Sequence, residues 1–518
     1  MTDRPNVLVF MTDQQRSVTI DGDHRLRAVT PNLDAFGVDA TVFAHGYAPS
    51  PHCCPSRASF FTGLHPSEHG VWNNVNVPNA LSRGPREGTA FWSSDLEAAG
   101  YRMAFTGKWH VDNRQGPGAY GWQELGPKPL WRGESISADE QRAAAVSAQL
   151  AGLRSAVPSG TDADVAEGRN DGEIIRPGWP AWSLYGTMEN PFGDDDVVAA
   201  GVRYLEEAAA EDAPFALYVG TLGPHDPYIP PRRFLDLYDP ESIELPDSFD
   251  DDLAGRPAMY SRIRDRFDQL TREEHRRALH HYLAFCSYQD ELFGRLLDTL
   301  HKSGLYEDTI VLYLSDHGDY TGEHGLWAKG LPSFLPAYQV PIVIKDANRD
   351  ATAAATRQVR RSELSVSLVD LGPTLLDLCG VQPGSPMSGE SVADELVAPS
   401  HRQRDLFMQS NGNEVYGIQR IVLTNRWKLV VNLFDDDELY DRHADPDEMI
   451  NLIGRAAPSG RVLGRPATDL VADAFRPIVQ DLYDRLWRFG LDHNDDIFNP
   501  YILTALATFG PLGQLRGG

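Results

Sequence analysis

The segment Thr309-Ile310-Val311-Leu312-Tyr313-Leu314-Ser315-Asp316-His317-Gly318-Asp319 joins a short apolar run to a loop of polar, reactive side chains. A short run with little polar alternation is typical of a strand that is buried on both faces of a sheet. Three further runs of this kind, each also followed by a polar loop, occupy residues 7–11, 102–105 and 215–219. The pattern predicts four buried strands with reactive side chains at their carboxyl ends.

Helical patterns lie between and after these runs, over residues 195–209, 282–300 and 364–378, and Gly380 is the expected C-cap of the third. Strands that alternate with helices predict an α/β fold with a mostly parallel sheet flanked by helices. Ligands of such sheets bind at the carboxyl ends of the strands. We therefore expect the four polar loops, with Asp13, Lys108, His110, His225 and Asp316, to meet at one site.

Two regions depart from the alternation. Residues 116–191 are rich in Pro, Gly and aromatic side chains, with an Ala-rich helix expected over 138–153, and they predict a long loop region inserted over one face of the sheet. After residue 400 the apolar period changes to two, which predicts a small antiparallel sheet followed by a helix over 471–489. We predict a catalytic α/β domain over residues 1–400 and a C-terminal unit of sheet, helix and tail over 401–518.

The chain of 518 residues carries a net charge of −27, from 47 Lys and Arg against 74 Asp and Glu. Such a surface repels nucleic acid and anionic membranes, so neither is expected as a partner. The four cysteines (Cys53, Cys54, Cys286 and Cys379) form no disulfide framework, and we expect a reducing compartment. The start lacks a signal-peptide pattern and no apolar stretch has membrane-spanning length, so the expected location is cytoplasmic.

Several side chains in the loops have both an ordinary and a chemical interpretation. Asp13, Asp316 and His317, with Gln14 beside the first, offer ligands for Ca²⁺, Mg²⁺ or Mn²⁺, and the imidazole favours Mn²⁺. On spacing alone, such pairs are also common in surface loops. A cysteine close to a cation, as in Cys53-Cys54-Pro55-Ser56-Arg57, could be an activated thiolate nucleophile.

The run from Cys53 to Arg57 also resembles the Cys-x-Pro-Ser-Arg motif of the type I, formylglycine-dependent sulfatases of the alkaline phosphatase superfamily. Ser315-Asp316-His317-Gly318, Gly107-Lys108-Trp109-His110, Pro224-His225 and the segment from Gly322 to Gly330 look like sulfatase segments too, and the resemblance extends from Asn6 to about Leu452. The choice of Gln14 and His317 is most similar to the choline sulfatase and phosphonate monoester hydrolase branches. The resemblance implies an alkaline-phosphatase-like fold.

The resemblance also implies roles for individual residues. A formylglycine-generating enzyme would oxidise Cys53 to formylglycine, whose hydrated diol Arg57 anchors with His110 beside it. One divalent ion, Ca²⁺ or Mn²⁺ with Mg²⁺ as a further option, would bind to the side chains of Asp13, Gln14, Asp316, His317 and the modified Cys53. The substrate-binding residues would be Lys108 and Lys329 on the sulfate oxygens, His225 on the ester oxygen and Asn74, for which Asn73 and Asn76 are alternatives.

The function that this resemblance implies is hydrolysis of aryl or alkyl sulfate esters through a covalent sulfo-enzyme intermediate. The alternatives are a phosphonate monoester or phosphodiester hydrolase that uses the same site, and a non-catalytic binding protein on the sulfatase fold. A cysteine-thiolate hydrolase explains neither Asp13 nor the pair Asp316-His317. The apolar tail beyond Asn499 favours a homo-oligomer, because an exposed apolar terminus tends to be buried against a neighbour.

Overall fold

The computed structural model describes residues 4–20, 25–126, 169–176, 182–347, 359–400, 402–413, 415–453 and 474–499. Its main feature is an eight-stranded sheet with the strand order β10-β2-β9-β8-β1-β7-β3-β4. In that order the strands are Arg360–Ser367, Thr41–Tyr47, Ile342–Lys345, Thr309–Ser315, Asn6–Thr12, Phe215–Gly220, Arg102–Gly107 and Gln123–Glu124.

The four strands predicted from apolar runs are β1, β3, β7 and β8, and they lie next to one another at the middle of this sheet. β1 pairs in parallel with both β7 and β8, so that Val9 lies opposite Tyr218 on one side and Leu312 on the other. Only β9 runs antiparallel to its neighbours among these strands. The prediction of a mostly parallel sheet is confirmed, and the carboxyl ends of β1, β3, β7 and β8 share one edge.

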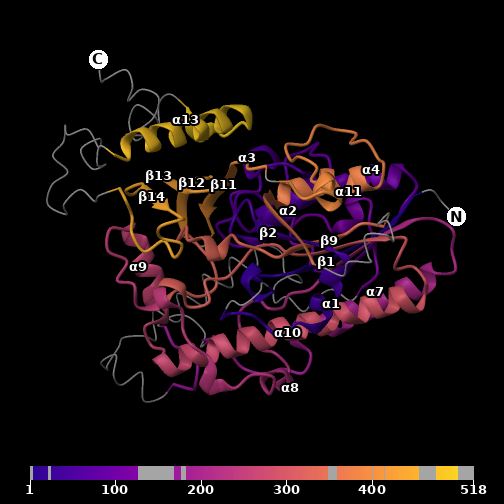
Figure 1. Ribbon diagram of the computed structural model, residues 1–518, viewed down its shortest axis with the longest axis horizontal. Coiled ribbons are helices and arrows are strands. Elements are labelled where there is room, and N and C mark those ends of the chain that lie inside the picture. The colour runs from indigo at the N-terminus through magenta and orange to yellow at the C-terminus, as the bar shows by residue number, and fades with distance from the viewer. Residues whose placement is uncertain are drawn as a thin grey trace.

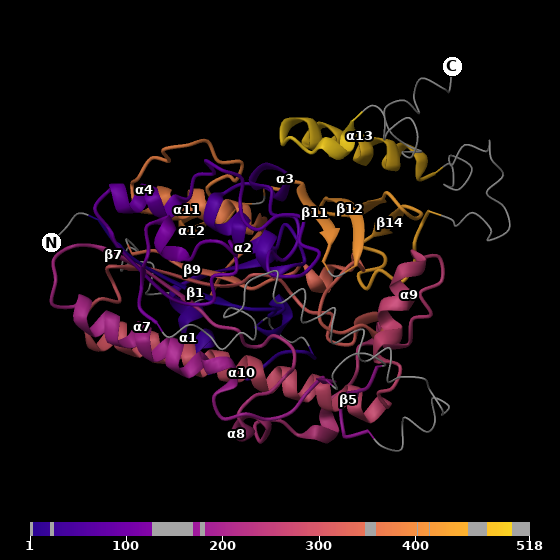
Figure 2. The same cartoon turned by 180° about the vertical axis from the view of Figure 1, so that it is seen from behind.

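Helices cover both faces of the sheet (Figures 1 and 2). On one face lie α1 (Pro31–Asp39), α7 (Asp194–Ala208) and α10 (Arg272–Lys302), whose apolar side chains share a core cluster with Leu8, Leu217 and Val311. On the other face lie α2 (Cys53–Thr62), α4 (Trp92–Ala98) and α11 (Leu371–Leu378). Covering both faces explains why the central strands are apolar throughout.

The predicted helices over 195–209 and 471–489 are found as Asp194–Ala208 and Arg476–Asp492, and two others differ more in their bounds. α10 begins at Arg272, ten residues before the predicted start, because Thr271 and Glu274 form a reciprocal capping box there. The prediction of a helix over 364–378 is wrong in its first part, where β10 continues to Ser367. Leu364 and Val366 are two residues apart and both buried, which is the alternation of a strand, and β10 pairs with β2 here. The helix α11 therefore starts only at Leu371.

The predicted antiparallel C-terminal sheet is confirmed as β11 (Leu406–Gly412), β12 (Tyr416–Leu423), β13 (Trp427–Asn432) and β14 (Glu438–Asp441). The helix α13 (Arg476–Asp492) packs on one face and α9 (Ala258–Arg264) lies by the other, as Figures 1 and 2 show. The remaining short elements are α3 (Pro66–His69), α8 (Arg232–Leu235), α12 (Ala393–Val397), β5 (Glu173–Ile174) and β6 (Trp182–Ser183).

Some expectations fall on residues outside the described ranges, namely the Ala-rich helix over 138–153 and the tail beyond Asn499. The four cysteines are buried and form no disulfide. Among the helices of the described ranges, none combines the length and the apolar character that crossing a bilayer requires.

Candidate active site

Four side chains from three separate segments meet at the carboxyl edge of the sheet. Asp13 follows β1, Asp316 and His317 follow β8, and Cys53 is the first residue of α2. Their possible ligand atoms all lie within 4.8 Å of one another, with the Cys53 Sγ atom 3.1 Å from His317 Nε2 and 3.9 Å from Asp13 Oδ1. All four side chains are almost completely buried. This donor set fits a divalent cation, and the loops after β1 and β8 meet here as predicted.

The surroundings of the cluster keep two of its members, His317 and Asp13, in the protonation states that a cation requires. The Nδ1 atom of His317 lies 2.9 Å from the carbonyl oxygen of Gly318, which orients Nε2 toward the cluster. Burial lowers the pKa of His317, which favours the neutral imidazole. Burial alone would raise the pKa of Asp13, but Lys108, His225 and Arg57 together hold it well below its ordinary value, so the carboxylate is charged.

Arg57 connects the two carboxylates. It stands one helical turn after Cys53 on α2, so both side chains point to the same side of the helix. Its Nε donates to Asp316 Oδ2 at 2.7 Å, and one terminal nitrogen donates to Asp13 Oδ2 at 3.1 Å. The other terminal nitrogen donates to the hydroxyl of Tyr218 at 2.9 Å. The guanidinium is completely buried, so it fixes the position of both carboxylates relative to Cys53.

Two lysines reach the site from separate loops. Lys108, after β3, forms an ion pair with Asp13. Lys329 lies with its Nζ 2.5 Å from His225 Nε2 and 2.5 Å from Gln14 Oε1. Burial opposes the charged form of Lys329, but attraction from Cys53 and Asp226 raises its pKa above the ordinary value. The ammonium therefore stays charged beside the histidine after β7.

The loop after residue 70 separates the asparagines that the sequence left as alternatives. Asn74 accepts a hydrogen bond from the backbone N–H of Cys54 at 3.0 Å, close to the start of α2. Asn76 is half-buried, and its Oδ1 lies 2.9 Å from His110 Nε2. The side chain of Asn73 bonds only to the backbone of its own loop, at Asn79 and Leu81, among the contacts found. Asn76 therefore contacts His110, a predicted site residue, whereas Asn74 binds the backbone at the start of the helix that carries Cys53.

Sequence reasoning missed four side chains that hold the others in place. Asp226 and Asp319 both accept from the Nε2 of Gln14, at 3.1 and 2.5 Å. The hydroxyl of Tyr228 donates to Asp319 at 2.6 Å, and Tyr218 contacts Arg57. Asp226 directly follows His225, and Asp319 directly follows Gly318. Their position in the predicted site loops could therefore have identified them as site residues. The tyrosines carry no such signal, because buried tyrosines are ordinary core residues.

The fold and this donor set together define an α/β protein whose buried donors at the carboxyl edge of the sheet fit a divalent cation. The sulfatase family description matches residues 5–381, and that of the C-terminal part of N-sulphoglucosamine sulphohydrolase matches residues 322–460. The chain therefore belongs to the sulfatase family, and it is a hydrolase of the sulfatase class. This confirms the resemblance from the motifs.

Individual relatives are similar over most of their length. The choline-sulfatase of Rhizobium meliloti is 29% identical over 482 residues, which cover 87% of this chain and 83% of that protein. The arylsulfatase of Clostridium perfringens is 25% identical over 462 residues, covering 87% and 90%. Among solved structures, a phosphonate monoester hydrolase from Silicibacter pomeroyi has a TM-score of 0.69 at 22% identity and covers 97% of each chain. That likeness shows the shared fold.

Proposed function

We propose that the protein hydrolyses aryl or alkyl sulfate esters with a formylglycine made from Cys53 and one divalent ion, Ca²⁺ or Mn²⁺ with Mg²⁺ as a further option. The observation that carries the proposal is the position of Cys53, whose Sγ lies within reach of Asp13 and His317 on the helix that also carries Arg57. The thiol occupies the place that the diol of formylglycine would take. Oxygen donors there, with two carboxylates and one imidazole, suit these cations.

The two groups supply a nucleophile: the formylglycine diol provides a hydroxyl, and a bound divalent ion lowers the pKa of that hydroxyl. We assign Asp13, Gln14, Asp316 and His317 as the protein ligands of the ion, with the modified Cys53. The carboxamide oxygen of Gln14 faces Lys329 at 2.5 Å. Its role as a ligand therefore stays a prediction, whereas the other four residues form the compact cluster.

The cations of the site account for the binding of an anionic ester. Lys108, Lys329 and Arg57 place three positive charges beside the cluster, against a net charge of −27 for the whole chain. Preorganised cations of this kind stabilise the charge that develops on the sulfate oxygens in the transition state. We assign Lys108 and Lys329 to the binding of these oxygens and Arg57 to the positioning of the nucleophile. Asn74 is assigned to substrate binding from the sequence motif alone, because its contact with the backbone N–H of Cys54 gives no support for that role.

His225 is positioned to protonate the leaving alcohol. Its Nδ1 lies 2.6 Å from the carbonyl oxygen of Asp226, and its Nε2 faces the ammonium of Lys329. General acid catalysis of this type contributes about 10²–10⁴-fold to the rate. His110, held by Asn76, is assigned to the neighbourhood of the nucleophile.

We propose a formylglycine-generating enzyme as the maturation partner. The modification is tested by mass spectrometry of the peptide around Cys53, in protein made together with that enzyme. We expect the aldehyde at Cys53, hydrolysis of an aryl sulfate by the metal-loaded protein, and loss of both in Cys53→Ala. Cys54→Ala is the matched control, because Cys54 is buried next to it but accepts only from the backbone of Val75 among the bonds found. An unmodified thiol in an active protein would refute the proposal.

A phosphonate monoester or a phosphodiester is the alternative substrate, because tetrahedral anions of similar size can share all these contacts. The comparison of kcat/KM for an aryl sulfate and the matching aryl phosphonate on the same metal-loaded protein decides between them. A preference for the phosphonate of several orders of magnitude would change the assigned substrate.

Three further assignments belong to the proposal: a cytoplasmic location, a homo-oligomer, and the division of the chain into a catalytic unit and a C-terminal unit near residue 400. The oligomer rests on the apolar tail, and an unchanged mass in solution after deletion of the residues beyond Asn499 would exclude assembly driven by that tail.

A further inference from the structure

The loop of residues 70–81 joins the candidate site to the C-terminal sheet. At the site, Asn74 accepts from the backbone N–H of Cys54 at 3.0 Å, and Asn76 Oδ1 lies 2.9 Å from His110 Nε2. The same loop also contacts the hairpin between β11 and β12, which belongs to a different sheet from the one that carries the site. A change at this hairpin can therefore reach the start of α2 and His110 through one loop.

Asn413, in the turn of this hairpin, holds the loop at two points. Its Oδ1 accepts from the backbone N–H of Asn74 at 3.0 Å, and its carbonyl oxygen accepts from Asn79 Nδ2 at 2.8 Å. Asn413 is 7% exposed, so water has little access to replace these bonds. Asn74 therefore donates to the hairpin with its backbone while it accepts from α2 with its side chain.

The local sequence of the hairpin explains why Asn413 reaches the loop. The register of β11 and β12 shifts between Ser410 and Gly412, and Gly412 has the left-handed φ of 76°. A Cβ atom at Gly412 would lie 2.0 Å from the carbonyl oxygen of Val415, so the close return of the chain requires glycine there. An irregularity of this kind re-aims the neighbouring side chain, which here is Asn413.

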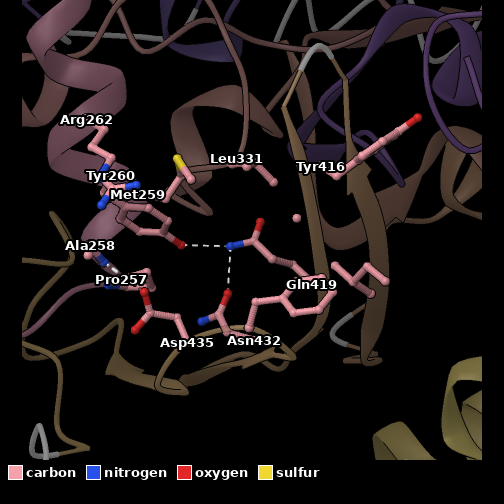
Figure 3. Close-up of a pocket in the computed structure, with 13 residues that line it drawn as sticks. Pro257, Ala258, Met259, Tyr260, Arg262, Leu331, Tyr416, Gln419, Asn432 and Asp435 are labelled. Carbon is pink, nitrogen blue, oxygen red and sulfur yellow. Dashed lines mark hydrogen bonds between the residues drawn. The ribbon is translucent and has the colours of Figure 1, made fainter. Parts of the chain in front are cut away.

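Two side chains of β12 contact the same loop. The hydroxyl of Tyr416 donates to the carbonyl oxygen of Asn79 at 2.6 Å, and Figure 3 shows the ring of Tyr416 extending away from Gln419. The guanidinium carbon of Arg420 lies 4.9 Å from the centre of the Trp72 ring. Arg420 is buried, so this cation–π contact is shielded from water. The strand β12 therefore contacts the loop near both of its ends.

The position of Asn74 matters because it binds the first turn of α2. The N–H groups of a first helical turn have no partner within the helix. Cys54 directly follows Cys53, and the acceptor found for its N–H among the described residues is the side chain of Asn74. A shift of the loop therefore releases the start of the helix that carries the proposed nucleophile. A misplacement of about 1 Å at reacting groups can lower a rate about 10²-fold.

We propose that Asn413 is a positioning residue of the active site, and that Tyr416 and Arg420 support it. The hairpin of the C-terminal sheet holds the loop, and the loop holds the start of α2 and His110. Asn413 acts through these groups and not on the substrate itself. The expected effect on the rate rests on the proposed sulfatase function, whereas the effect on the loop and on α2 does not.

Steady-state kinetics of the metal-loaded full chain test the positioning role. Asn413→Leu removes the acceptor at similar volume, and we expect kcat for an aryl sulfate to fall about 10–100-fold. KM should change less than threefold, because Lys108 and Lys329 lie on other loops. Asn413→Asp keeps an oxygen acceptor and should restore most of the rate. Val415→Ala, on the same hairpin, is the matched control, because this aliphatic side chain is 46% exposed and can form none of these bonds.

Hydrogen exchange, followed by mass spectrometry on the full chain, tests the same contacts without a substrate. In Asn413→Leu we expect faster exchange in the peptides that cover residues 72–79 and the start of α2, because the N–H groups of Asn74 and Cys54 lose their fixed acceptors. Tyr416→Phe removes only a hydroxyl from a side chain that is 51% exposed. It should also speed exchange in the loop, and it serves as the second variant if Asn413→Leu does not fold.

The two measurements separate this inference from the proposed function. Unchanged exchange of the loop in Asn413→Leu, or an equal change in Val415→Ala, overturns the inference even if the protein hydrolyses an aryl sulfate. Faster exchange with an unchanged kcat overturns the positioning role. A protein that hydrolyses no aryl sulfate but shows the faster exchange at α2 refutes the proposed function and supports the connection from the hairpin to α2.

Discussion

Gln14 shows how one side chain organises the loops around the candidate site. Its backbone has the left-handed φ of 68°, which turns the side chain away from the course of β1. Two carboxylates, Asp226 and Asp319, accept from its Nε2, so its Oε1 must face the other way, toward the ammonium of Lys329. Lys329 is therefore held by a carboxamide whose orientation is fixed.

Replacement of Lys329 by methionine keeps most of the side-chain length and removes the charge. We expect kcat/KM for an aryl sulfate to fall about 10²–10³-fold, the usual cost of losing one preorganised group that stabilises transition-state charge. Steady-state kinetics of the metal-loaded protein measure it. Lys302→Met is the control, since Lys302 is 79% exposed and pairs with Asp298 at the end of α10. A loss of less than threefold in Lys329→Met would remove Lys329 from the proposed mechanism.

At the same scale, the sequence predicted the cluster but not its supports. Asp13, Asp316 and His317 follow buried strands directly, so the parallel sheet alone brings them together. The choice between Asn74 and Asn76 could not be predicted, because it depends on how the loop after residue 70 lies against His110. Such contacts join residues from separate loops, and neither apolar period nor motif spacing encodes them.

At the level of elements, the loop after β7 is held by the start of α7. The carboxylate of Asp194 accepts from the backbone N–H groups of Leu222 and Gly223, both at 2.8 Å, and this places His225. Gln289 on α10 donates to the same carboxylate at 3.2 Å. The sequence predicted α7 and β7 as separate elements, and the packing of the sheet layers brings this helix start to the loop that carries His225.

Asp194 also makes a testable contribution to the pH dependence of stability. Burial raises its pKa to about 7, although its hydrogen bonds act in the opposite direction. Between about pH 4, the ordinary pKa of Asp, and pH 7, the folded state therefore retains a proton that the unfolded state has lost. Stability from this group is present at low pH and is lost as the pH rises through that window.

We expect Asp194→Asn, which cannot titrate, to flatten the decrease in stability from pH 4 to pH 7. Urea unfolding midpoints at several pH values measure the profile. Asp195→Asn controls for the loss of a carboxylate, because Asp195 is about half exposed and pairs with Arg295. If the stability of Asp194→Asn and of the unaltered protein changed with pH in the same way, Asp194 would already be ionised at low pH and the prediction would be wrong.

On the scale of the whole molecule, the candidate cation site joins the ends of β1 and β8 to the start of α2. Its two carboxylates are paired with Arg57 and Lys108, so their charges are compensated by the protein itself. We therefore expect the protein to stay folded in a chelator. A divalent ion at 100 times its Kd should add about 2.7 kcal/mol, which raises Tm by about 2–3 °C in a chain of this length. Thermal unfolding with EDTA, Ca²⁺ and Mn²⁺ measures the shift, and Asp316→Asn should remove it.

The net charge of −27 sets the long-range field that an anionic substrate meets, while the cations of the site act only at short range. At 0.01 M ionic strength the Debye length is about 30 Å, and repulsion by the whole surface reaches the approaching ester. At 0.15 M it is about 8 Å, so the lysines of the site remain effective while most of the repulsion is screened. We expect KM for an aryl sulfate to fall as NaCl is raised over this range at constant pH and metal concentration. A KM that rises with salt would mean that the local cations dominate even at long range.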